Sequence, residues 1–527
     1  MSKLAKTIVL TAVAAFFCSG EAGAEQWKIL GPRPMGMGGA FVAVAKGPIA
    51  QYWNPAGLAQ EENTSGLELP IGARAEFTGG VLQDANALGR LVDKYQAVQS
   101  AQTAGGKIDA DQMATVVKGI ATISGMNEPG KGLLADVEGG VNFKFSKIAV
   151  SINNYTSVGA SPFVDSTNIG LGSATGITGV SFASGGNVTA PADTASRDTL
   201  TTALNSVGTF PQIENMLCGS GGCLNAQLGG LISNETLANT LINATAMTPD
   251  QVLAAANIIQ ENAVQAAPVI QNLGSGVNNP YSNNQSNLTV RGGSFTELAF
   301  GYARPVLIPG LIVGGNLKAI FGSVGYTRFN VLQNDAGTTD ALKDYNKNLA
   351  KSVRPGIDIG LLMEADKYFT SLPMKPRFGL VMRNINSPGF DQPSLAINNG
   401  ESSKLSYDSQ MRAGLAVSPF NFWTLAMDMD VTKNKTPVRG YKSRQLSLGT
   451  EVNIFNRPSI NIPLRVGLIK NIADSASKPA YTAGFGINLL HMILDVGGSI
   501  SSETIKLDDG GTVRSSASVA ASLAFLF

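Results

Sequence analysis

The sequence predicts an all-β fold: a transmembrane antiparallel β-barrel of about 14 strands, with an N-terminal hatch in its lumen and helical extracellular insertions. Three observations predict it. Long stretches alternate apolar and polar residues with a period of two, which is the pattern of a strand with one apolar face. Only 15% of the 527 residues are charged and 60 are glycine, as suits a barrel whose lipid-facing and lumen-facing residues average out. The chain also ends in an apolar strand with aromatic residues at Phe525 and Phe527.

Residues 1–24 predict a secretory signal peptide. Lys3 and Lys6 form its charged start, residues 8–17 form its apolar centre, and residues 22–24 form an A-x-A cleavage site. No later run reaches the roughly 18 consecutive apolar residues of a membrane-spanning helix. We therefore expect an exported protein that is located in the bacterial outer membrane.

The alternating strands fit two architectures. A soluble sandwich or barrel would bury the apolar face, whereas a transmembrane barrel would turn it outward against lipid. The predicted strands have about 10–15 residues, whereas soluble strands usually have about five or six and a bilayer needs about 9–11. This length and the export signal favour the transmembrane barrel. The predicted strands span approximately residues 66–79, 133–145, 147–160, 286–303, 310–330, 353–366, 376–387, 407–418, 421–433, 441–455, 459–471, 480–489, 491–502 and 513–527.

The connections between these strands alternate in length. Those after strands 2, 4, 6, 8, 10 and 12 are short, and those after strands 1, 3, 5 and 7 are long. Transmembrane barrels have short periplasmic turns and longer outer loops. We therefore expect extracellular long loops and two periplasmic termini, with a hatch at residues 25–65 and the barrel at residues 66–527.

Three insertions on the long-loop side are expected to contain helices: the first has apolar residues at helical spacing, the second has several helical runs, and the third has a short polar helix. They lie at about residues 80–131, 161–285 and 332–350, and helices of the second are predicted at about 197–207, 226–246 and 248–272. One interpretation is an extracellular cap that receives a ligand or a protein partner. The other is a set of protective surface loops. In either case the apolar faces require the helices to pack on each other or on the barrel rim.

Two cysteines, Cys218 and Cys223, remain after the signal peptide is removed. In an oxidising compartment they are expected to form a local disulfide. A redox or metal pair is the alternative, but the spacing is not C-x-x-C and the only histidine, His491, lies far along the chain. We therefore expect no cofactor and no metal.

The segment from Gly31 to Gln60 is rich in Gly, Ala and Pro and almost free of charge. Its prolines and glycines disfavour a regular helix or strand, yet its apolar composition requires a place of burial. It contains Arg33, Gly36, Gly38, Gly39, Ala40, Ala45, Asn54, Pro55, Ala56, Gly57 and Leu58. In this pattern it resembles the N-terminal plug of FadL-like outer-membrane proteins, the long-chain fatty-acid transporter family. The form of the motif is similar to a branch of that family named for conjugal transfer protein TraF.

The resemblance implies a hatch folded into the barrel from the periplasmic end and a passive route for hydrophobic small molecules. It implies that Asn54, Pro55 and Ala56 form the turn that anchors the hatch to the wall, and Asn54 can indeed hydrogen-bond nearby backbone while Pro55 fixes the turn. It also implies a monomer. The last strand, ending at Phe525 and Phe527, resembles the signal that the barrel-assembly machinery of bacteria recognises.

The polar faces of the predicted strands carry charges of both signs, so pairs between wall and hatch are expected. These residues are Glu68, Arg74, Glu76, Glu297, Asp358, Glu364, Arg377, Arg412, Asp428, Asp430, Glu451 and Arg465. The sequence shows no Ser-His-Asp arrangement and no phosphate-binding loop, which favours a non-enzyme. A net charge of +1 indicates no nucleic-acid partner.

Three functional hypotheses follow. The first is an outer-membrane channel, surrounded by outer-membrane lipid, for passive uptake of long-chain fatty-acid-like or aromatic compounds. The second is a structural component of a conjugal transfer or secretion apparatus, which docks envelope protein partners through its helical outer loops. The third is a sealed barrel that only displays its loops.

Overall fold

The protein is described from a computed structural model. The structure describes residues 24–60, 65–85, 109–165, 168, 193–218, 233–244, 247–273, 284–330, 345–369, 372–455, 457, 459–506 and 510–527. The predicted signal peptide before Ala24, residue Cys223 and most of the insertion at 332–350 lie outside the described residues. The disulfide between Cys218 and Cys223 therefore stays a prediction.

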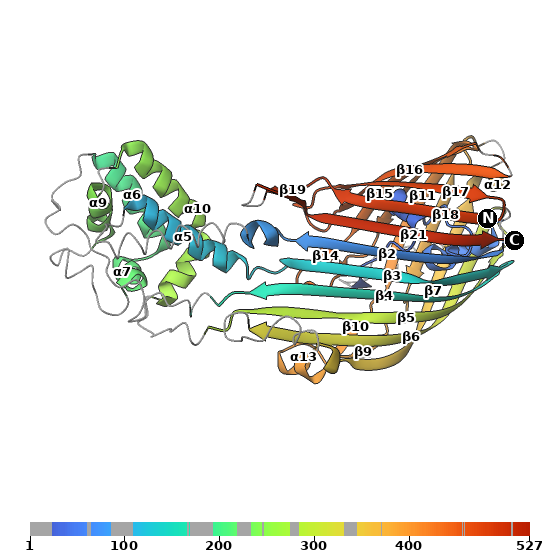
Figure 1. Cartoon of the computed structure of the whole chain (residues 1–527), viewed down its shortest axis with the longest axis horizontal. Coiled ribbons are helices and arrows are strands. Elements are labelled where there is room, and N and C mark those ends of the chain that lie inside the picture. Colours follow the sequence, from blue (N-terminus) through green and yellow to red (C-terminus); the bar gives the residue numbers. More distant parts are fainter. Residues whose placement is uncertain are drawn as a thin grey trace, which may run out of the picture.

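Fourteen antiparallel strands close into a barrel, which confirms the predicted fold class (Figure 1). The first strand pairs with the last, so that Gly66 lies opposite Leu526 and the sheet has no free edge. In chain order the strands are β2 (Gly66–Thr78), β3 (Gly132–Phe145), β4 (Ile148–Phe163), β5 (Asn287–Pro305), β6 (Leu311–Asn330), β7 (Ala350–Glu364), β8 (Arg377–Arg383), β11 (Gln410–Phe420), β12 (Trp423–Asp430), β15 (Gln445–Ile454), β16 (Ile460–Asn471), β17 (Ala480–Leu489), β18 (Met492–Ser501) and β21 (Ser516–Leu526).

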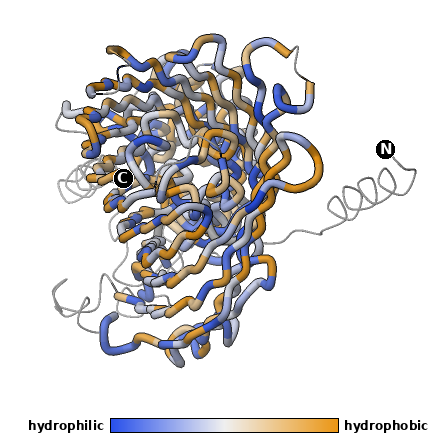
Figure 2. Tube along the Cα trace, turned by 90° about the vertical axis from the view of Figure 1, so that its right-hand side faces the viewer, coloured by the Kyte–Doolittle hydropathy of each residue, from blue (hydrophilic) through white to orange (hydrophobic). Residues whose placement is uncertain are grey.

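The apolar face of the strands points out of the barrel. Ile71, Val466 and Val519 are 62%, 57% and 65% exposed on the outer side, whereas Asp428, on the lumen side, is 1% exposed. Hydrophobic and hydrophilic residues alternate along the strands in the view of Figure 2. This orientation is that of a barrel in lipid, because a soluble barrel buries its apolar face. Among the described residues, no helix is long and apolar enough to cross a membrane.

The strand predicted at residues 376–387 ends earlier, at Arg383. Asn384 and Ser387 have φ angles of 51° and 45°, in the left-handed region, and Pro388 has no N–H, so the chain leaves the sheet here. It then forms β9 (Gly389–Asp391), α13 (Ser394–Asn398) and β10 (Lys404–Ser406) before it rejoins the barrel at Gln410. The next predicted strand, at residues 407–418, therefore begins later than expected.

The two ends of the described chain lie at opposite ends of the barrel. At the short-turn end, the Phe527 amide donates to the Ser65 carbonyl at 2.9 Å, beside the start of β2. At the long-loop end, β1 (Ala24–Glu25) pairs in parallel with β13 (Asn434–Lys435), which lies in the loop between β12 and β15. The expectation that both ends lie on the short-turn side does not hold for this chain, because the hatch runs the length of the lumen.

A helical body lies beyond the long-loop end of the barrel (Figure 1). Its helices are α5 (Ala110–Gly125), α6 (Thr194–Val207), α7 (Phe210–Cys218), α9 (Asn234–Ala244) and α10 (Pro249–Leu273), and they share one buried apolar cluster. The sequence indicates α5, α6, α9 and α10. It does not indicate α7, whose 9 residues show too few turns for a helical period.

Candidate functional site

The hatch consists of short turns that fill the barrel lumen. Its regular pieces are α2 (Pro32–Gly36), α3 (Ala50–Trp53) and the 3-10 helix η1 (Pro55–Ala59). α2 and η1 each begin with a proline, at the position where a helix needs no N–H donor. Trp27, Phe41 and Trp53 are at most 1% exposed and belong to a buried cluster that includes wall residues. The hatch and the wall therefore share one core.

Asn54 joins the hatch to strand β7. Its side-chain amide donates to the carbonyls of Val42, at 3.1 Å, and Leu361, at 3.0 Å, and its side-chain oxygen accepts from the Ala56 amide at 3.1 Å. Two of these bonds close the turn within the hatch, and the bond to Leu361 crosses to the wall. Asn54 is buried, so each group left unpaired would cost about 1–3 kcal/mol. The Asn-Pro-Ala turn thus lies against the wall, and its importance for anchoring stays a prediction.

The first glycines of the hatch motif lie where the hatch backbone meets the wall backbone. Gly38 has a φ of +65°, and a Cβ there would lie 2.7 Å from the carbonyl oxygens of Leu448 and Leu468. A Cβ on Gly36 would lie 3.1 Å from the Cα of Gly484 in β17. The contacts at Gly38 are closer than a Cβ permits, and the contact at Gly36 would require the wall to shift slightly.

The other residues of the motif have different neighbours. Gly39 has a φ of +83° and lies beside the Arg412 guanidinium. Gly57 packs within the hatch, where a Cβ would lie 2.2 Å from the Ala45 carbonyl oxygen. Leu58 is completely buried in the shared core. The motif therefore combines close approach to the wall with packing inside the hatch.

Glycines on the inner face of the wall complete this close approach. In nine strands a glycine faces the hatch so closely that an added Cβ would crowd the neighbouring atoms. They are Gly301, Gly314, Gly360, Gly379, Gly414, Gly449, Gly467, Gly484 and Gly497. The abundance of glycine is evident from the sequence, but this role is not. Glycines at lumen-facing positions of successive strands are the signal that could have revealed it.

Two hatch cations pair with wall carboxylates. The Lys28 ammonium donates to Asp136 of β3 at 2.7 Å, and both side chains are buried. The Arg33 guanidinium donates to both carboxylate oxygens of Glu451, each at 2.8 Å, and this two-pronged geometry fixes direction as well as distance. Glu451 also accepts from Arg465 at 2.7 Å. The expected ion pairs between wall and hatch are therefore present; the sequence does not single out Lys28, and it indicates Arg33 only as part of the hatch motif.

Asp428 of β12 binds the hatch backbone. One carboxylate oxygen accepts from the amides of Phe41, at 2.7 Å, and Val42, at 2.8 Å. Arg412 of β11 lies 3.6 Å from the same oxygen and donates to the Gly39 carbonyl at 3.1 Å. Two adjacent strands thus hold consecutive peptide groups of the hatch from the same side.

Trp27 lies between two arginines of the wall. The Arg383 guanidinium lies 5.4 Å from the centre of the Trp27 ring and 4.1 Å from that of Tyr52. The Arg412 guanidinium lies 5.5 Å from Trp27 and 5.7 Å from Trp53. A cation over an aromatic face is stabilised by about 2 kcal/mol or more where water is excluded. These contacts hold the aromatic part of the hatch.

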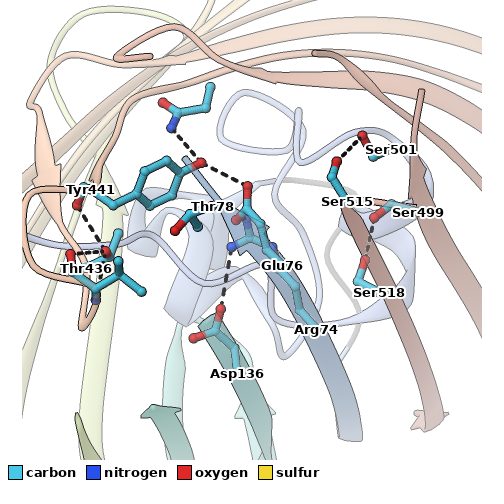
Figure 3. A network of polar contacts seen from close by, with 12 residues as sticks. Arg74, Glu76, Thr78, Asp136, Thr436, Tyr441, Ser499, Ser501, Ser515 and Ser518 are labelled. Atoms are coloured by element: carbon cyan, nitrogen blue, oxygen red, sulfur yellow. Dashed lines mark hydrogen bonds and ion pairs between the residues drawn. The ribbon is translucent and has the colours of Figure 1, made fainter. Parts of the chain in front are cut away.

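A polar network lies on the wall at the long-loop end of the barrel (Figure 3). Arg74 of β2 pairs with Glu76 and, at 3.4 Å, with Asp136, which is also the partner of Lys28. The Tyr441 hydroxyl donates to Glu76 at 2.9 Å. Burial, together with the charge on Glu76, raises the pKa of Tyr441 above its ordinary value, so the hydroxyl keeps the proton that it donates. Contacts therefore run from the hatch to the loop between β12 and β15.

Phe525, Phe527, Cys218 and His491 lie away from this interface. Phe525, on β21, is 42% exposed, and Phe527, which follows the end of β21, is 62% exposed. The Phe527 ring lies 6.3 Å from that of Phe143. Cys218 ends α7, and His491 lies in the turn between β17 and β18. Within the described part of the chain, no group of three or more His, Cys, Asp or Glu residues could hold a metal ion.

The family of the F plasmid transfer operon protein TraF matches residues 51–430, which is more than half of the chain. The chain belongs to the TraF family. The matched region runs from α3 of the hatch to the end of β12, and it includes Asn54, Asp136 and Asp428. No curated protein matches the TraF-family chain.

Several solved structures of channels are similar to this TraF-family chain. The CymD monoaromatic hydrocarbon channel is 11% identical, with 95% of this chain and 99% of that chain covered and a TM-score of 0.38. The Pseudomonas putida toluene transporter TodX is 10% identical, with 96% and 99% covered and a TM-score of 0.37. A Pseudomonas aeruginosa FadL homologue is 8% identical, with 96% and 99% covered and a TM-score of 0.37.

Proposed function

We propose that this TraF-family protein is an outer-membrane channel for hydrophobic small molecules, of the fatty-acid-like or aromatic class, and that the hatch is its gate. The observation that carries the proposal is an apolar interface between hatch and wall. Tyr155, Ile312, Leu362 and Val381 face the lumen from β4, β6, β7 and β8 and are buried in the same cluster as the hatch. A shift of the hatch from these strands would open a path lined by apolar side chains.

The way the hatch is held also supports a gate. All fourteen strand pairings that close the barrel are made without the hatch. From Gln26 onward the hatch is held by ion pairs, side-chain hydrogen bonds and close backbone contacts, and the charged ones lie mainly on β3, β12 and β15. It can therefore move without breaking the sheet. A barrel of this strand number is wider than one filled by its own side chains, so it needs a plug in order to be closed.

Uptake into vesicles tests the proposal. The full mature chain is reconstituted into vesicles, and entry of a long-chain fatty acid or an alkylbenzene is measured against protein-free vesicles. Lys28→Gln with Arg33→Gln removes the two hatch cations that pair with Asp136 and Glu451 and is expected to raise the rate of entry. The matched control, Lys351→Gln with Lys404→Gln, changes two exposed lysines near the long loops and is expected to leave entry unchanged. The channel would be refuted if the compound entered protein-free vesicles, vesicles with the wild-type chain and vesicles with the double variant at the same rate.

A second function, docking in a conjugal transfer apparatus, is favoured by two observations. The family takes its name from a plasmid transfer operon, and the helical body beyond the barrel has an apolar core of its own. The two functions make different predictions for a strain that lacks the protein. A mating defect with normal uptake of hydrophobic compounds would select the docking function, and an uptake defect with normal mating would select the channel.

A further inference from the structure

The outer wall of the barrel carries an apolar groove across β11, β12, β15, β16 and β17. Its volume is about 760 Å³, within the range of roughly 300–1,000 Å³ that is usual for small-molecule sites. The side chains that line it on the lipid side include Leu415, Leu425, Met427, Leu448 and Val466. The groove therefore faces the bilayer and not the lumen.

The groove lies where the wall is packed directly on the hatch. Ala416, Ala426, Gly449 and Gly467 line the same groove, and the two alanines are buried in the core shared with the hatch. A Cβ on Gly449 would lie 2.2 Å from the Met37 carbonyl oxygen. With so little side-chain volume between them, wall backbone and hatch backbone are in contact. We attribute the concave outer surface to this close contact, because the wall of a barrel is otherwise convex.

Aromatic side chains border the end of the groove nearest the short turns. The rings of Phe420 and Trp423 are stacked with centres 6.3 Å apart, and Phe422 stacks on Phe420 at 5.4 Å. The Trp423 indole N–H donates to the Thr450 hydroxyl, a group that lines the groove, at 2.8 Å. Aromatic residues at this level of a barrel lie at the membrane–water interface.

A lysine, Lys375, lies at the same end of the groove. The Lys375 ammonium donates to the Asn421 side chain at 3.2 Å, in the turn that carries Phe420 and Phe422. The backbone of that lysine turn is held to β11, because the Ser418 amide donates to the Met374 carbonyl at 2.7 Å. Lys375 is exposed to solvent. An apolar groove, an interfacial aromatic stack and a cation thus follow each other along one wall.

We propose that this wall holds a phospholipid with an anionic headgroup: one acyl chain lies in the groove, and the phosphate lies against Lys375. The occupant follows from the position of the groove, which is continuous with the lipid-facing surface, and from the charge at its edge. An ammonium near the membrane surface favours an anionic lipid over a zwitterionic one. The proposal requires only that the barrel lies in a bilayer and does not depend on the proposed channel function.

Trp423 is a native reporter for this site. It lies on the outer wall, whereas Trp27 and Trp53 are at most 1% exposed inside the barrel. The full mature chain is reconstituted in phosphatidylcholine vesicles that contain a small, equal mole fraction of either dibrominated phosphatidylglycerol or dibrominated phosphatidylcholine. Bromine on an acyl chain quenches tryptophan emission on contact. We expect stronger quenching by the brominated phosphatidylglycerol.

Matched variants separate the headgroup from the groove. Lys375→Gln is expected to weaken the association of phosphatidylglycerol about fivefold and to remove the preference. Val466→Phe fills the groove and is expected to reduce quenching by both lipids, whereas Val519→Phe, on an exposed valine of β21 outside the groove, is expected to have no effect. Lys147→Gln, in another short turn, should keep the preference. Circular dichroism confirms that each variant retains the barrel.

Two results would overturn the proposal. Equal quenching by the two lipids in the wild-type chain would show that only bulk lipid contacts Trp423. Quenching in Lys375→Gln that still favours phosphatidylglycerol as in the wild-type chain would show that this lysine does not hold the headgroup.

Discussion

At the scale of single residues, glycine on the inner wall sets how closely the hatch approaches. Gly314 and Gly315 provide a matched pair, because they are adjacent in β6 and face opposite sides. A Cβ on Gly314 would lie 2.4 Å from the carbonyl carbon of Pro55, in the Asn-Pro-Ala turn. A Cβ on Gly315 would lie 3.2 Å from the Asp358 carbonyl oxygen in the sheet.

We therefore predict that Gly314→Ala displaces the Asn-Pro-Ala turn. It should lower the free energy of unfolding by about 1–3 kcal/mol, the usual cost of an extra methyl group in a packed core. Hydrogen exchange should accelerate over residues 54–59 in this variant and much less in Gly315→Ala. Equal exchange over these residues in the two variants would show that the hatch does not depend on this contact.

Asp428 is the residue whose loss should affect the hatch most. Asp428→Ala removes the acceptor of the Phe41 and Val42 amides and leaves the buried Arg412 guanidinium without this partner. We predict a loss of about 3–5 kcal/mol in the free energy of unfolding, measured by urea titration in detergent. Asp428→Asn keeps an acceptor oxygen and should lose less. An unchanged urea midpoint for Asp428→Ala would contradict this assignment.

The sequence predicts which face of the barrel these residues occupy better than it predicts which residues they contact. Alternation along the strands correctly places charged residues such as Asp428 and Glu451 on the lumen face. It does not indicate that Glu451 pairs with Arg33, 418 positions away, or that Asp136 pairs with Lys28, 108 positions away. Those pairs depend on the register of the barrel and on the path of the hatch through it, which no local pattern specifies.

At the scale of elements, the loop between β12 and β15 holds the start of the hatch. It pairs with β1 through β13 and reaches Glu76 through Tyr441. We predict that Tyr441→Phe costs about 0.5–1.5 kcal/mol and accelerates hydrogen exchange at residues 24–28 and 434–443. Tyr302→Phe, on the outer wall, is the control and should change neither. Hydrogen exchange that accelerates only at residues 434–443 would show that the loop does not stabilise the start of the hatch.

The helical body is stabilised in part by local interactions at the ends of its helices. Asp109 begins α5 with a capping box: its side chain accepts from the Gln112 amide at 2.8 Å, and its own amide donates to the Gln112 side chain at 3.2 Å. Asp109→Ala should destabilise α5 by about 1 kcal/mol, measured by hydrogen exchange of residues 110–125. Asp111→Ala, in the first turn of α5 but outside the capping box, should have a smaller effect. If the two variants destabilised α5 equally, the negative charge near the start of the helix, and not the capping box, would be the source of the stabilisation.

Elements with a regular period are predictable from this sequence, and elements set by tertiary contacts are not. The fourteen strands follow from the alternation of apolar and polar residues, because one face of each strand meets lipid. β9, α13 and β10 do not, because they form after the left-handed residues Asn384 and Ser387 turn the chain out of the sheet. The hatch is an intermediate case: its motif indicates a plug, but its short helices exist only inside the barrel.

At the scale of the whole molecule, the hatch spans the lumen from one end to the other. It begins beside β13 at the long-loop end, contacts the wall glycines along its course, and joins β2 at the short-turn end. Its ion pairs and the contacts of Asp428 lie mainly on β3, β12 and β15, whereas its apolar contacts include β4, β6, β7 and β8. The barrel closes as a sheet without the hatch, and we propose that the hatch closes it as a pore.

Removal of the hatch tests this claim most directly. The full mature chain and a variant that lacks residues 25–60 are inserted into planar bilayers, and their conductance is compared after circular dichroism has shown that both keep the barrel. We predict a large, steady conductance in the variant and little conductance in the full chain. A variant that retains the barrel but conducts no more than the full chain would contradict it.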